Sequence, residues 1–382
     1  MHAVKVAMFS RFPRDLRAPR GGVETVTLAL SRALTRVDGI DLHVVALEKG
    51  LGRLEITQCE GITVHRLPRS RWPQMLDVVM GPGRKTVRSY LANLAPDIVH
   101  FHETYGLGIG WLPMPYVITI HGFDDANIMA ENGYLAWLRV PAWQHILRRA
   151  LARQEHIISI TPYVKDRIRP LTRATIYEID NPIDPACFTV PRHEVAGRVF
   201  YAGWVSPRKN ALGLVRAFAE VARAVDHASL HIAGELCEPG YVSDIREAIV
   251  ANGLTDQVVL LGRISPETIR KELGEACVFV LPSFQENAPM AIAEAMATGV
   301  PIITSNRCGM PFMVDESKTG FLVEPEDTHA MADRITTLLD NDNLRHMMGT
   351  AASHVAQDRF HPDSVARKTV AVYRGILSSA RP

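Results

Sequence analysis

Short runs of apolar and β-branched residues recur along the chain, and most are followed by a longer segment with apolar residues at helical spacing. Such runs, closed by glycine, proline or polar residues, are typical of buried strands in parallel sheets. Their alternation with helical segments predicts an α/β fold with doubly wound parallel sheets. The predicted strands are 4–9, 42–47, 62–67, 97–101, 116–120, 157–160, 176–179, 199–202, 230–234, 258–262, 278–281 and 300–304.

The length of the chain and one proline-rich stretch predict two domains. At 382 residues the chain is long for a single core and suits two domains of ordinary size. Strand 176–179 is followed by N-P-I-D-P at 181–185, which is typical of a hinge, and a new strand begins at 199. We therefore predict a domain boundary between residues 183 and 184.

The segment 289–305 predicts a buried helix that contains a carboxylate. Residues 290–298 are good helix formers, apolar almost all round, and Gly299 and Pro301 end the run. Glu294 sits in the middle of this helix, where a charge is costly unless it is paired or hydrogen-bonded. Two kinds of partner are open: an arginine or backbone group of the protein, or the hydroxyl groups of a ligand.

The start of the same helix favours a ligand. The first backbone N–H groups, those of Met290 and Ala291, have no partner within the helix and form an anion site. Glu294 lies about 6 Å further along the helix axis. This separation suits a nucleotide whose diphosphate rests on the helix start and whose ribose hydroxyls donate to Glu294.

Two other loops carry groups suited to phosphate. Arg208 and Lys209 stand in the loop after strand 199–202. Adjacent cations can be ordinary surface charge, but a diphosphate nearby favours phosphate clamping, since Arg binds phosphate in a fork and Lys as a point charge. Gly21 and Gly22 follow the first strand, where they allow a tight turn and also a close approach of backbone amides to phosphate.

Composition narrows the class of protein. Hydrophobic content of 47% with 22% charged residues describes a soluble globular protein, and a net charge of +1 gives no general attraction to nucleic acid. The five cysteines form no CxxC pair and are expected to be reduced. No signal peptide or membrane-spanning run is evident, so we expect a cytoplasmic protein, peripheral at the inner face of a membrane at most.

Two clusters of basic and aromatic residues are candidates for such membrane contact. The first runs from Arg69 to Arg88 and includes Trp72, and the second runs from Trp137 to Arg153. Charge runs are usually solvated surface. The alternative is an interfacial surface that meets anionic lipid or a lipid-linked acceptor.

Glu286 and Glu294, with seven residues between them, stand in the setting S-F-Q-E-N-A-P-M-A-I-A-E-A-M-A-T-G-V-P. This string resembles the signature of retaining glycosyltransferases of the GT-B fold, in the large family called GT4. The resemblance implies two Rossmann-like doubly wound domains facing across a cleft, with a C-terminal helix crossing back to the first. It further implies that residues 1–183 and 362–382 bind the acceptor, and that residues 184–361 bind the nucleotide sugar.

The resemblance also implies roles for the two glutamates and the cationic loop. In the family the first Glu contacts the donor sugar hydroxyls and the second contacts the ribose, which correspond to Glu286 and Glu294. The loop after strand 199–202 resembles the family's G-R-x-x-x-x-K phosphate loop, with Lys209 as its Lys. Trp204 stands where the family usually has Arg, and we expect Arg208 to compensate.

Further contacts are implied in the first half and around the nucleotide. His121, with Asp124 beside it, matches the family's His at the donor sugar or reaction centre. The residues expected to act in catalysis are His121, Arg208, Lys209 and Glu286. The residues expected to contact the donor are Gly21, Gly22, Gly203, Arg208, Lys209, Arg263, Ile264, Glu286, Asn287, Ala288, Pro289, Met290 and Glu294.

A metal site is not expected. His100 and His102 share a face of their strand and His121 ends the next one, but zinc would need a further ligand that the sequence does not offer. The resemblance implies that Arg208 and Lys209 supply the positive charge instead.

The expected reaction is transfer of a sugar from a nucleoside diphosphate donor, a UDP- or GDP-sugar, to a saccharide or lipid-linked acceptor, with retention of the anomeric configuration. No carboxylate pair is left for a glycosidase, because Glu286 and Glu294 are committed to binding. Two alternatives stay open. One is an epimerase of the same fold, and the other is a non-catalytic nucleotide-sugar-binding subunit, which Trp204 makes conceivable.

Overall fold

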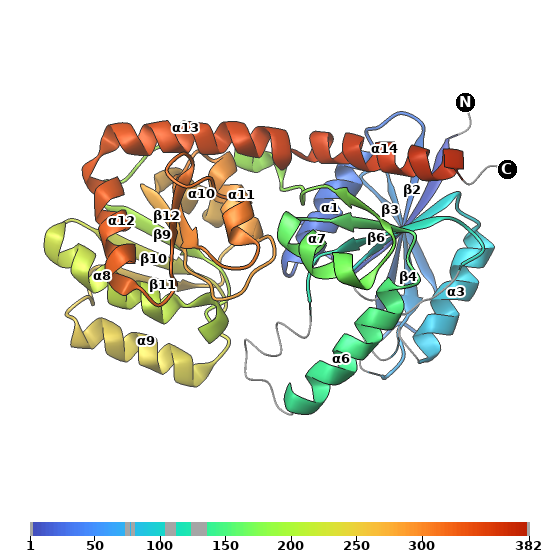
Figure 1. The fold of residues 1–382 in the computed structure, drawn as a ribbon, viewed down its shortest axis with the longest axis horizontal. Coiled ribbons are helices and arrows are strands. Elements are labelled where there is room, and N and C mark those ends of the chain that lie inside the picture. Colours follow the sequence, from blue (N-terminus) through green and yellow to red (C-terminus); the bar gives the residue numbers. More distant parts are fainter. Residues whose placement is uncertain (1–2, 73–76, 78–80, 104–111, 124–135, 380–382) are drawn as a thin grey trace. The chain divides into compact units, whose positions relative to one another are not determined.

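The computed structural model describes residues 3–72, 77, 81–103, 112–123 and 136–379 (Figure 1). These residues form two compact units. One unit holds the described residues up to Ile183 together with His361 and the last helix, and the other spans Asp184–Phe360. Each is an α/β domain built on a parallel sheet, as the alternation of strand and helix patterns predicts.

The sheet of the first unit has eight strands within the described residues, in the order β3-β4-β2-β1-β5-β6-β7-β8. All neighbours are parallel except β3, which runs antiparallel to β4 at the edge. The chain moves outward from β1 to β4 and then returns to β5 on the other side of β1. The strands are β1 Val4–Phe9, β2 Ile40–Glu48, β3 Glu55–Cys59, β4 Ile62–Pro68, β5 Ile98–His102, β6 Tyr116–Ile120, β7 His156–Ser159 and β8 Thr175–Glu178.

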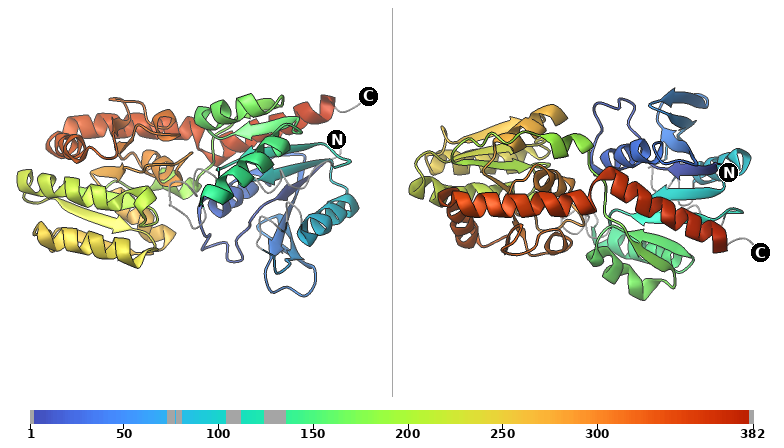
Figure 2. Two further views of the ribbon diagram at one scale, coloured as in Figure 1. Left: turned by 60° about the horizontal axis from the view of Figure 1, so that its bottom comes forward. Right: turned by 90° about the horizontal axis from the view of Figure 1, so that it is seen from above.

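Helices cover this sheet, and the C-terminal helix α14 packs against α1 (Figures 1 and 2). Tyr373 and Ile376 of α14 join Leu30 and Leu34 of α1 in one buried apolar cluster with the strands. The predicted return of the C-terminal helix to the first domain is confirmed. The helices are α1 Gly22–Leu34, α3 Pro82–Leu94, α6 Ala136–Leu151, α7 Pro162–Ile168, the 3-10 turn η1 Arg169–Leu171 and α14 Pro362–Ser379.

The second unit has a six-stranded sheet, wholly parallel, in the order β11-β10-β9-β12-β13-β14. Phe200 of β9 and Phe279 of β12 face each other edge to face in its core, with ring centroids 6.1 Å apart. The chain moves from β9 outward to β11 and then crosses back to β12. The strands are β9 Arg198–Ala202, β10 Ser229–Ala233, β11 Val258–Gly262, β12 Val278–Leu281, β13 Ile302–Ser305 and β14 Gly320–Val323.

The helices of the second unit follow the predicted amphipathic and apolar segments. None of the helices in the described ranges combines the length and apolar character that crossing a bilayer requires. The helices are η2 Pro185–Thr189, η3 Pro207–Lys209, α8 Ala211–Ala224, α9 Pro239–Ala251, α10 Pro266–Glu275, α11 Met290–Ala297, η4 Met310–Phe312, α12 Thr328–Asp340 and α13 Asp342–Arg359.

Two strands depart from the prediction. β3 was not expected, because its residues are polar and mostly exposed and show no apolar run. β14 is not among the predicted strands, but it pairs with β13, and Gly320 allows this because the carbonyl of Ile302 leaves no room for a side chain there. Both are edge strands, but only β3 lacks an apolar run, whereas β14 contains the mostly buried run F-L-V, which the strand prediction did not include.

Candidate active site

The best-formed candidate site lies where the sheet of the second unit changes direction. β9 and β12 are neighbours, but the chain leaves them toward opposite sides of the sheet. The loops that follow two such strands diverge at the carboxyl edge and leave a crevice that binds ligands in many open α/β sheets. Arg208 and Lys209 follow β9, and Glu286 follows β12.

These three charged residues form one ion cluster. The Glu286 Oε1 atom lies 2.5 Å from Arg208 Nη1 and 2.6 Å from Lys209 Nζ. Each of the three side chains is only 13–15% exposed. Burial alone would raise the pKa of Glu286, but the Lys209 and Arg208 cations outweigh it and hold that pKa below its usual value. Glu286 is therefore ionised at neutral pH and neutralises much of the charge expected to bind phosphate.

Backbone contacts fix the loop that carries Glu286. Arg208 Nη1 donates to the carbonyl of Gln285 at 2.8 Å, and the amide of Gly309 donates to the carbonyl of Glu286 at 2.9 Å. A side chain at Gly309 would collide with the carbonyl of Asn287. Cys308 has a positive φ of 54°, a region that favours glycine.

Asn210 fixes the loop that carries the two cations. It adopts a left-handed backbone conformation after η3, and its side chain accepts from the amide of Gly213 at 3.2 Å. Its side-chain amide also donates to the carbonyl of Pro325 at 2.7 Å. Asn210 thus ends η3, caps α8 and holds Lys209 in place, a role that the sequence analysis missed.

Glu294 lies on α11, a helix whose other residues are apolar and mostly buried. Among the described residues it makes no ion pair or side-chain hydrogen bond, whereas Arg270 pairs instead with Asp184 at 3.6 Å. Burial, and then the negative charge of Asp184, raise the pKa of Glu294 to about 7, with Arg270 opposing them. Of the two kinds of partner that the sequence leaves open for Glu294, a protein cation is not found among the described residues.

The start of α11 is available for an anion. Pro289 stands just before the helix rather than as its first residue, and no side chain caps the first turn. Asn287 and Ala288 lead into this turn, which places Met290 at the carboxyl edge close in sequence to Glu286. The arrangement combines an N-terminal helix dipole with the neighbouring cationic loop.

Not every expected donor residue joins this cluster. Gly203 is the first residue after β9, and its carbonyl packs against Gly234 so closely that a side chain at Gly234 would clash. Trp204 is 54% exposed. Arg263 and Ile264 follow β11, which is two strands away from β9, and the structure brings neither into contact with the ion cluster.

In the first unit, His121 follows β6 in a set of uncharged histidines. His102 Nδ1 lies 2.9 Å from His121 Nε2, and Asn181 also hydrogen-bonds His121. Burial lowers the pKa of His121 to about 4 and that of His102 well below its usual value. His121 is therefore held in one orientation and is neutral at physiological pH. Asp124 lies outside the described residues.

Two other first-unit positions of interest are Gly21, just before α1, and His100, within β5. Gly21 has a positive φ of 81° and precedes α1, which begins at Gly22 without a side-chain cap. The ring of His100 points instead to structural partners, with Tyr373 Oη at 2.6 Å and Thr119 Oγ1 at 2.7 Å. Within the described ranges no group of three potential ligands could hold a metal ion.

These buried histidines predict acid sensitivity. The pKa values of His65 and His121 fall from about 6.5 to about 4 on folding, mainly through burial, so the unfolded chain takes up protons first as the pH falls. Each should therefore cost up to about 3 kcal/mol of stability between pH 6.5 and 4, and nothing above pH 6.5. Urea unfolding at pH 7.5 and 5.0 measures this loss.

The variant His65→Gln tests the cause, because it removes one titrating group far in the sequence from the candidate site. We expect a smaller loss of stability at pH 5.0 in this variant. The exposed His354 of α13 in the second unit is the control, and His354→Gln should keep the acid sensitivity of the wild type. Equal acid sensitivity in His65→Gln and wild type would contradict the explanation.

Comparison with known proteins finds a matching family model for each of the two units. The family model "Glycosyltransferase Family 4" matches residues 20–186, and the model "Glycosyl transferases group 1" matches residues 192–355. The chain belongs to glycosyltransferase family 4. This glycosyltransferase uses a nucleoside diphosphate sugar as its donor, and retention of anomeric configuration is typical of its family. The prediction of a GT4 enzyme is confirmed.

Individual relatives are distant. A D-inositol 3-phosphate glycosyltransferase of Corynebacterium efficiens is 23% identical over 93% of this chain and 92% of its own. A GDP-mannose-dependent alpha-(1-6)-phosphatidylinositol monomannoside mannosyltransferase of Mycobacterium tuberculosis is 30% identical over 44% of this chain and 45% of its own. The structure of Anabaena Alr3699/HepE in complex with UDP and glucose has a TM-score of 0.71 and 16% identity, over 97% and 99% of the two chains. The predicted GT-B fold is confirmed.

Proposed function

We propose that the glycosyltransferase binds the diphosphate of its donor at the direction change in the second sheet, on Arg208, Lys209 and the start of α11. The ion cluster carries this proposal. Glu286 holds the mostly buried cations of Arg208 and Lys209 in position in the ligand-free protein. A diphosphate can replace the Glu286 carboxylate, because its oxygen atoms accept the same hydrogen bonds and carry more negative charge.

In this proposal the donor displaces Glu286 from the cations. The diphosphate neutralises Arg208 and Lys209, and the freed Glu286 carboxylate accepts hydrogen bonds from the hydroxyl groups of the donor sugar. Glu294 accepts from the ribose hydroxyls, which supply the donors that its carboxylate lacks among the described residues. Donor binding thus gives Glu294 the hydrogen-bond donors that a buried carboxylate needs, and it moves Glu286 from the two cations to the sugar hydroxyls.

The catalytic role proposed for these residues follows from the charge that develops on the donor as its sugar–phosphate bond breaks. Cleavage of the bond between the anomeric carbon and the phosphate oxygen leaves a cation-like sugar and a diphosphate with additional negative charge. Lys209, Arg208 and the amides of Met290 and Gly22 would stabilise that charge, which is commonly the largest contribution to catalysis. The departing phosphate oxygen would take the proton of the acceptor hydroxyl on the same face, and the neutral His121 would contact the donor sugar.

The donor base is proposed to be uracil or guanine. The Mycobacterium tuberculosis relative is named for GDP-mannose, and the Anabaena structure holds UDP and glucose. A thermal-shift panel of UDP, GDP, ADP, CDP and TDP with the full chain tests this choice. We expect UDP or GDP to give the largest rise in melting temperature, because a ligand of the native state stabilises it by mass action. No shift with either would contradict the proposal.

The acceptor is proposed to be a saccharide or a lipid-linked molecule, with the protein cytoplasmic and peripheral at the inner membrane face. The name of the Mycobacterium tuberculosis relative includes phosphatidylinositol monomannoside, a glycolipid. Trp137 of this chain is 75% exposed on α6, which also presents Arg148 and Arg149 to solvent. Flotation with vesicles containing phosphatidylglycerol tests the contact through α6, and no binding at low salt would contradict it.

A further inference from the structure

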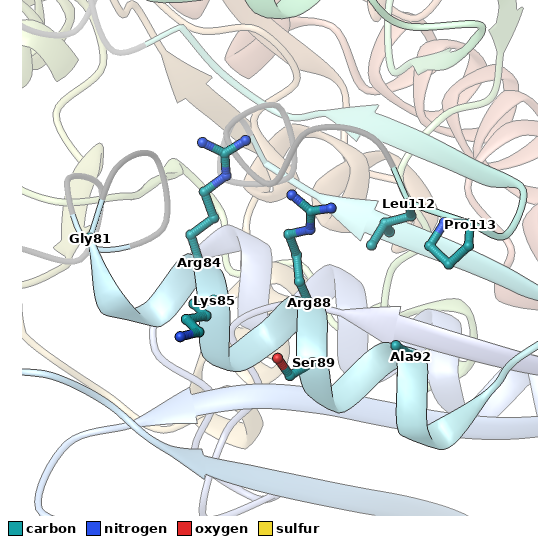
Figure 3. Close-up of a pocket in the computed structure, with 8 residues that line it drawn as sticks. All are labelled: Gly81, Arg84, Lys85, Arg88, Ser89, Ala92, Leu112 and Pro113. Atoms are coloured by element: carbon teal, nitrogen blue, oxygen red, sulfur yellow. The ribbon is translucent and has the colours of Figure 1, made fainter.

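A pocket of about 560 Å³ lies along α3 in the first unit, and none of its lining residues belongs to the proposed donor site. Arg84, Lys85, Arg88 and Ser89 line it from the helix, and Leu112 and Pro113 line it from the segment before β6. Figure 3 shows the guanidinium groups of Arg84 and Arg88 on the side of the helix toward Leu112. The pocket therefore has a cationic wall and a small apolar wall.

Among the described residues, two of the three cations that line this pocket have no ion-pair or hydrogen-bond partner. The sequence of α3, P-G-R-K-T-V-R-S-Y-L-A-N-L, holds three cations and no acidic residue. The exposed side chains of Lys85 and Arg88 make no ion pair or hydrogen bond with any described residue. Although the net charge of the chain is only +1, the positive charges of Lys85 and Arg88 lie together at this pocket.

The cations also stand where an isolated helix would not favour them. Arg84 lies in the first turn, at the positive end of the helix dipole, and it is four residues from the like-charged Arg88. Gly83 in the same turn has a packing role, since its amide donates to Asp77 Oδ1 at 2.7 Å and a Cβ there would collide with the Asp77 carboxylate. The repulsion between the cations of α3 has no such structural role. An anion in the pocket would relieve this repulsion.

The position of the pocket suits an acceptor. α3 joins β4 to β5, so its first turn lies toward the carboxyl edge of the sheet, and Arg84 and Lys85 lie in that part of the helix. His121 follows the carboxyl end of β6 in the same parallel sheet. The cationic end of the pocket and the proposed reaction-centre histidine are therefore at one edge of the first unit.

We propose that this pocket binds the phosphate group of a phosphorylated acceptor. Lys85 and Arg88 neutralise the phosphate, the Ser89 hydroxyl donates to it, and Leu112 and Pro113 contact the carbon skeleton beside it. The identification of the ligand as the acceptor rests on the proposed function, whereas the phosphate chemistry rests on the pocket alone. The phosphate belongs either to a water-soluble phosphate ester or to a lipid headgroup.

The test uses the full chain saturated with UDP or GDP, which occupies the donor site and leaves the pocket as the second phosphate site. Calorimetry with glycerol 3-phosphate measures the soluble source. Flotation with phosphatidylcholine vesicles, with and without phosphatidylglycerol, measures the lipid source. The variant is Lys85→Gln with Arg88→Gln, and the control is Lys49→Gln with Arg53→Gln, which removes two exposed cations from the same unit.

We expect the pocket variant to lose at least about tenfold in affinity for one of the two probes, with nucleotide affinity unchanged, while the control keeps both. Loss with glycerol 3-phosphate assigns a soluble acceptor, and loss with phosphatidylglycerol vesicles assigns a lipid headgroup. Unchanged affinity for both probes would overturn the proposal. Failure of the donor proposal would appear separately, as absent nucleotide binding in the wild type.

Discussion

Replacing Lys209 with methionine is expected to lower the rate of sugar transfer by at least about a hundredfold. Methionine keeps an unbranched side chain but removes the charge that would stabilise the departing diphosphate, and removal of one such group costs about 10²–10³ in kcat. The protein should still fold, because Arg208 remains paired with Glu286 at 2.5 Å. Steady-state transfer assays with a responsive nucleotide sugar measure the effect.

The exposed Lys271 of α10 provides the matched control, since it also lies beside a carboxylate, at 3.8 Å from Glu275. Lys271→Met should transfer sugar at the wild-type rate. Near-normal turnover of Lys209→Met would contradict the proposal that Lys209 stabilises the departing diphosphate.

Glu286→Gln is expected to strengthen nucleotide binding and, at the same time, to lower the rate of sugar transfer. In the ligand-free protein Glu286 competes with the diphosphate for Arg208 and Lys209. Removing its charge should therefore tighten binding of free UDP or GDP by roughly tenfold, the scale of one partly screened charge pair. Sugar transfer should nevertheless fall, because the neutral amide binds the sugar hydroxyls less strongly. Calorimetry and initial rates measure the two effects, and weaker nucleotide binding in this variant would contradict the competition.

Glu294→Gln is expected to stabilise the free protein and to weaken nucleotide binding. The folded pKa of about 7 lies above the usual value of 4.5, so the carboxyl group costs nothing below pH 4.5 and its cost grows as the pH rises to about 7. By linkage that cost reaches about 3 kcal/mol at pH 8. The amide should remove it, so the free energy of unfolding should rise at pH 8 and stay nearly unchanged at pH 4.5.

Nucleotide affinity should move the other way, with a loss of about 2 kcal/mol, the scale of a hydrogen bond to a charged group. Urea unfolding at the two pH values and calorimetry with UDP and GDP provide the two measurements. Glu247→Gln, an exposed carboxylate of α9, should change neither. If Glu294→Gln bound the nucleotide as tightly as wild type, its ribose role would be wrong.

Much of the fold could be predicted because burial on both faces leaves a strong pattern. The four residues of β12, V-F-V-L, are all buried, and their apolar run predicts the strand directly. β3 leaves no such trace, since one edge of it faces solvent and its pairing with β4 depends on a turn through Glu60 and Gly61, both at positive φ. Edge strands of this kind depend on tertiary pairing more than on their own sequence.

The candidate site could be predicted in its residue types but not in its ligand-free pairing. Sequence reasoning placed Lys209 and Glu286 near the same donor, yet it did not foresee that they bind each other when no donor is present. Their contact depends on the strand order, which brings β9 beside β12. Side chains separated by more than seventy residues meet only through such an arrangement.

The supporting residues were missed for a different reason. Asn210 and Gly309 act through backbone conformation and close packing, with Asn210 at a φ of 58° and Gly309 against the carbonyl of Asn287. Such positions carry no chemical signature of their own. Asn181 was interpreted as part of a hinge, whereas it also hydrogen-bonds His121. Conformational and orienting roles therefore needed the structure.

A crystal structure of the full chain with UDP or GDP tests the central claim most directly. The account predicts a phosphate oxygen within hydrogen-bonding distance of Lys209 Nζ, the Glu286 carboxylate moved away from Arg208 and Lys209, and the ribose hydroxyls on Glu294. A nucleotide bound elsewhere, with the cluster of Arg208, Lys209 and Glu286 intact, would contradict it.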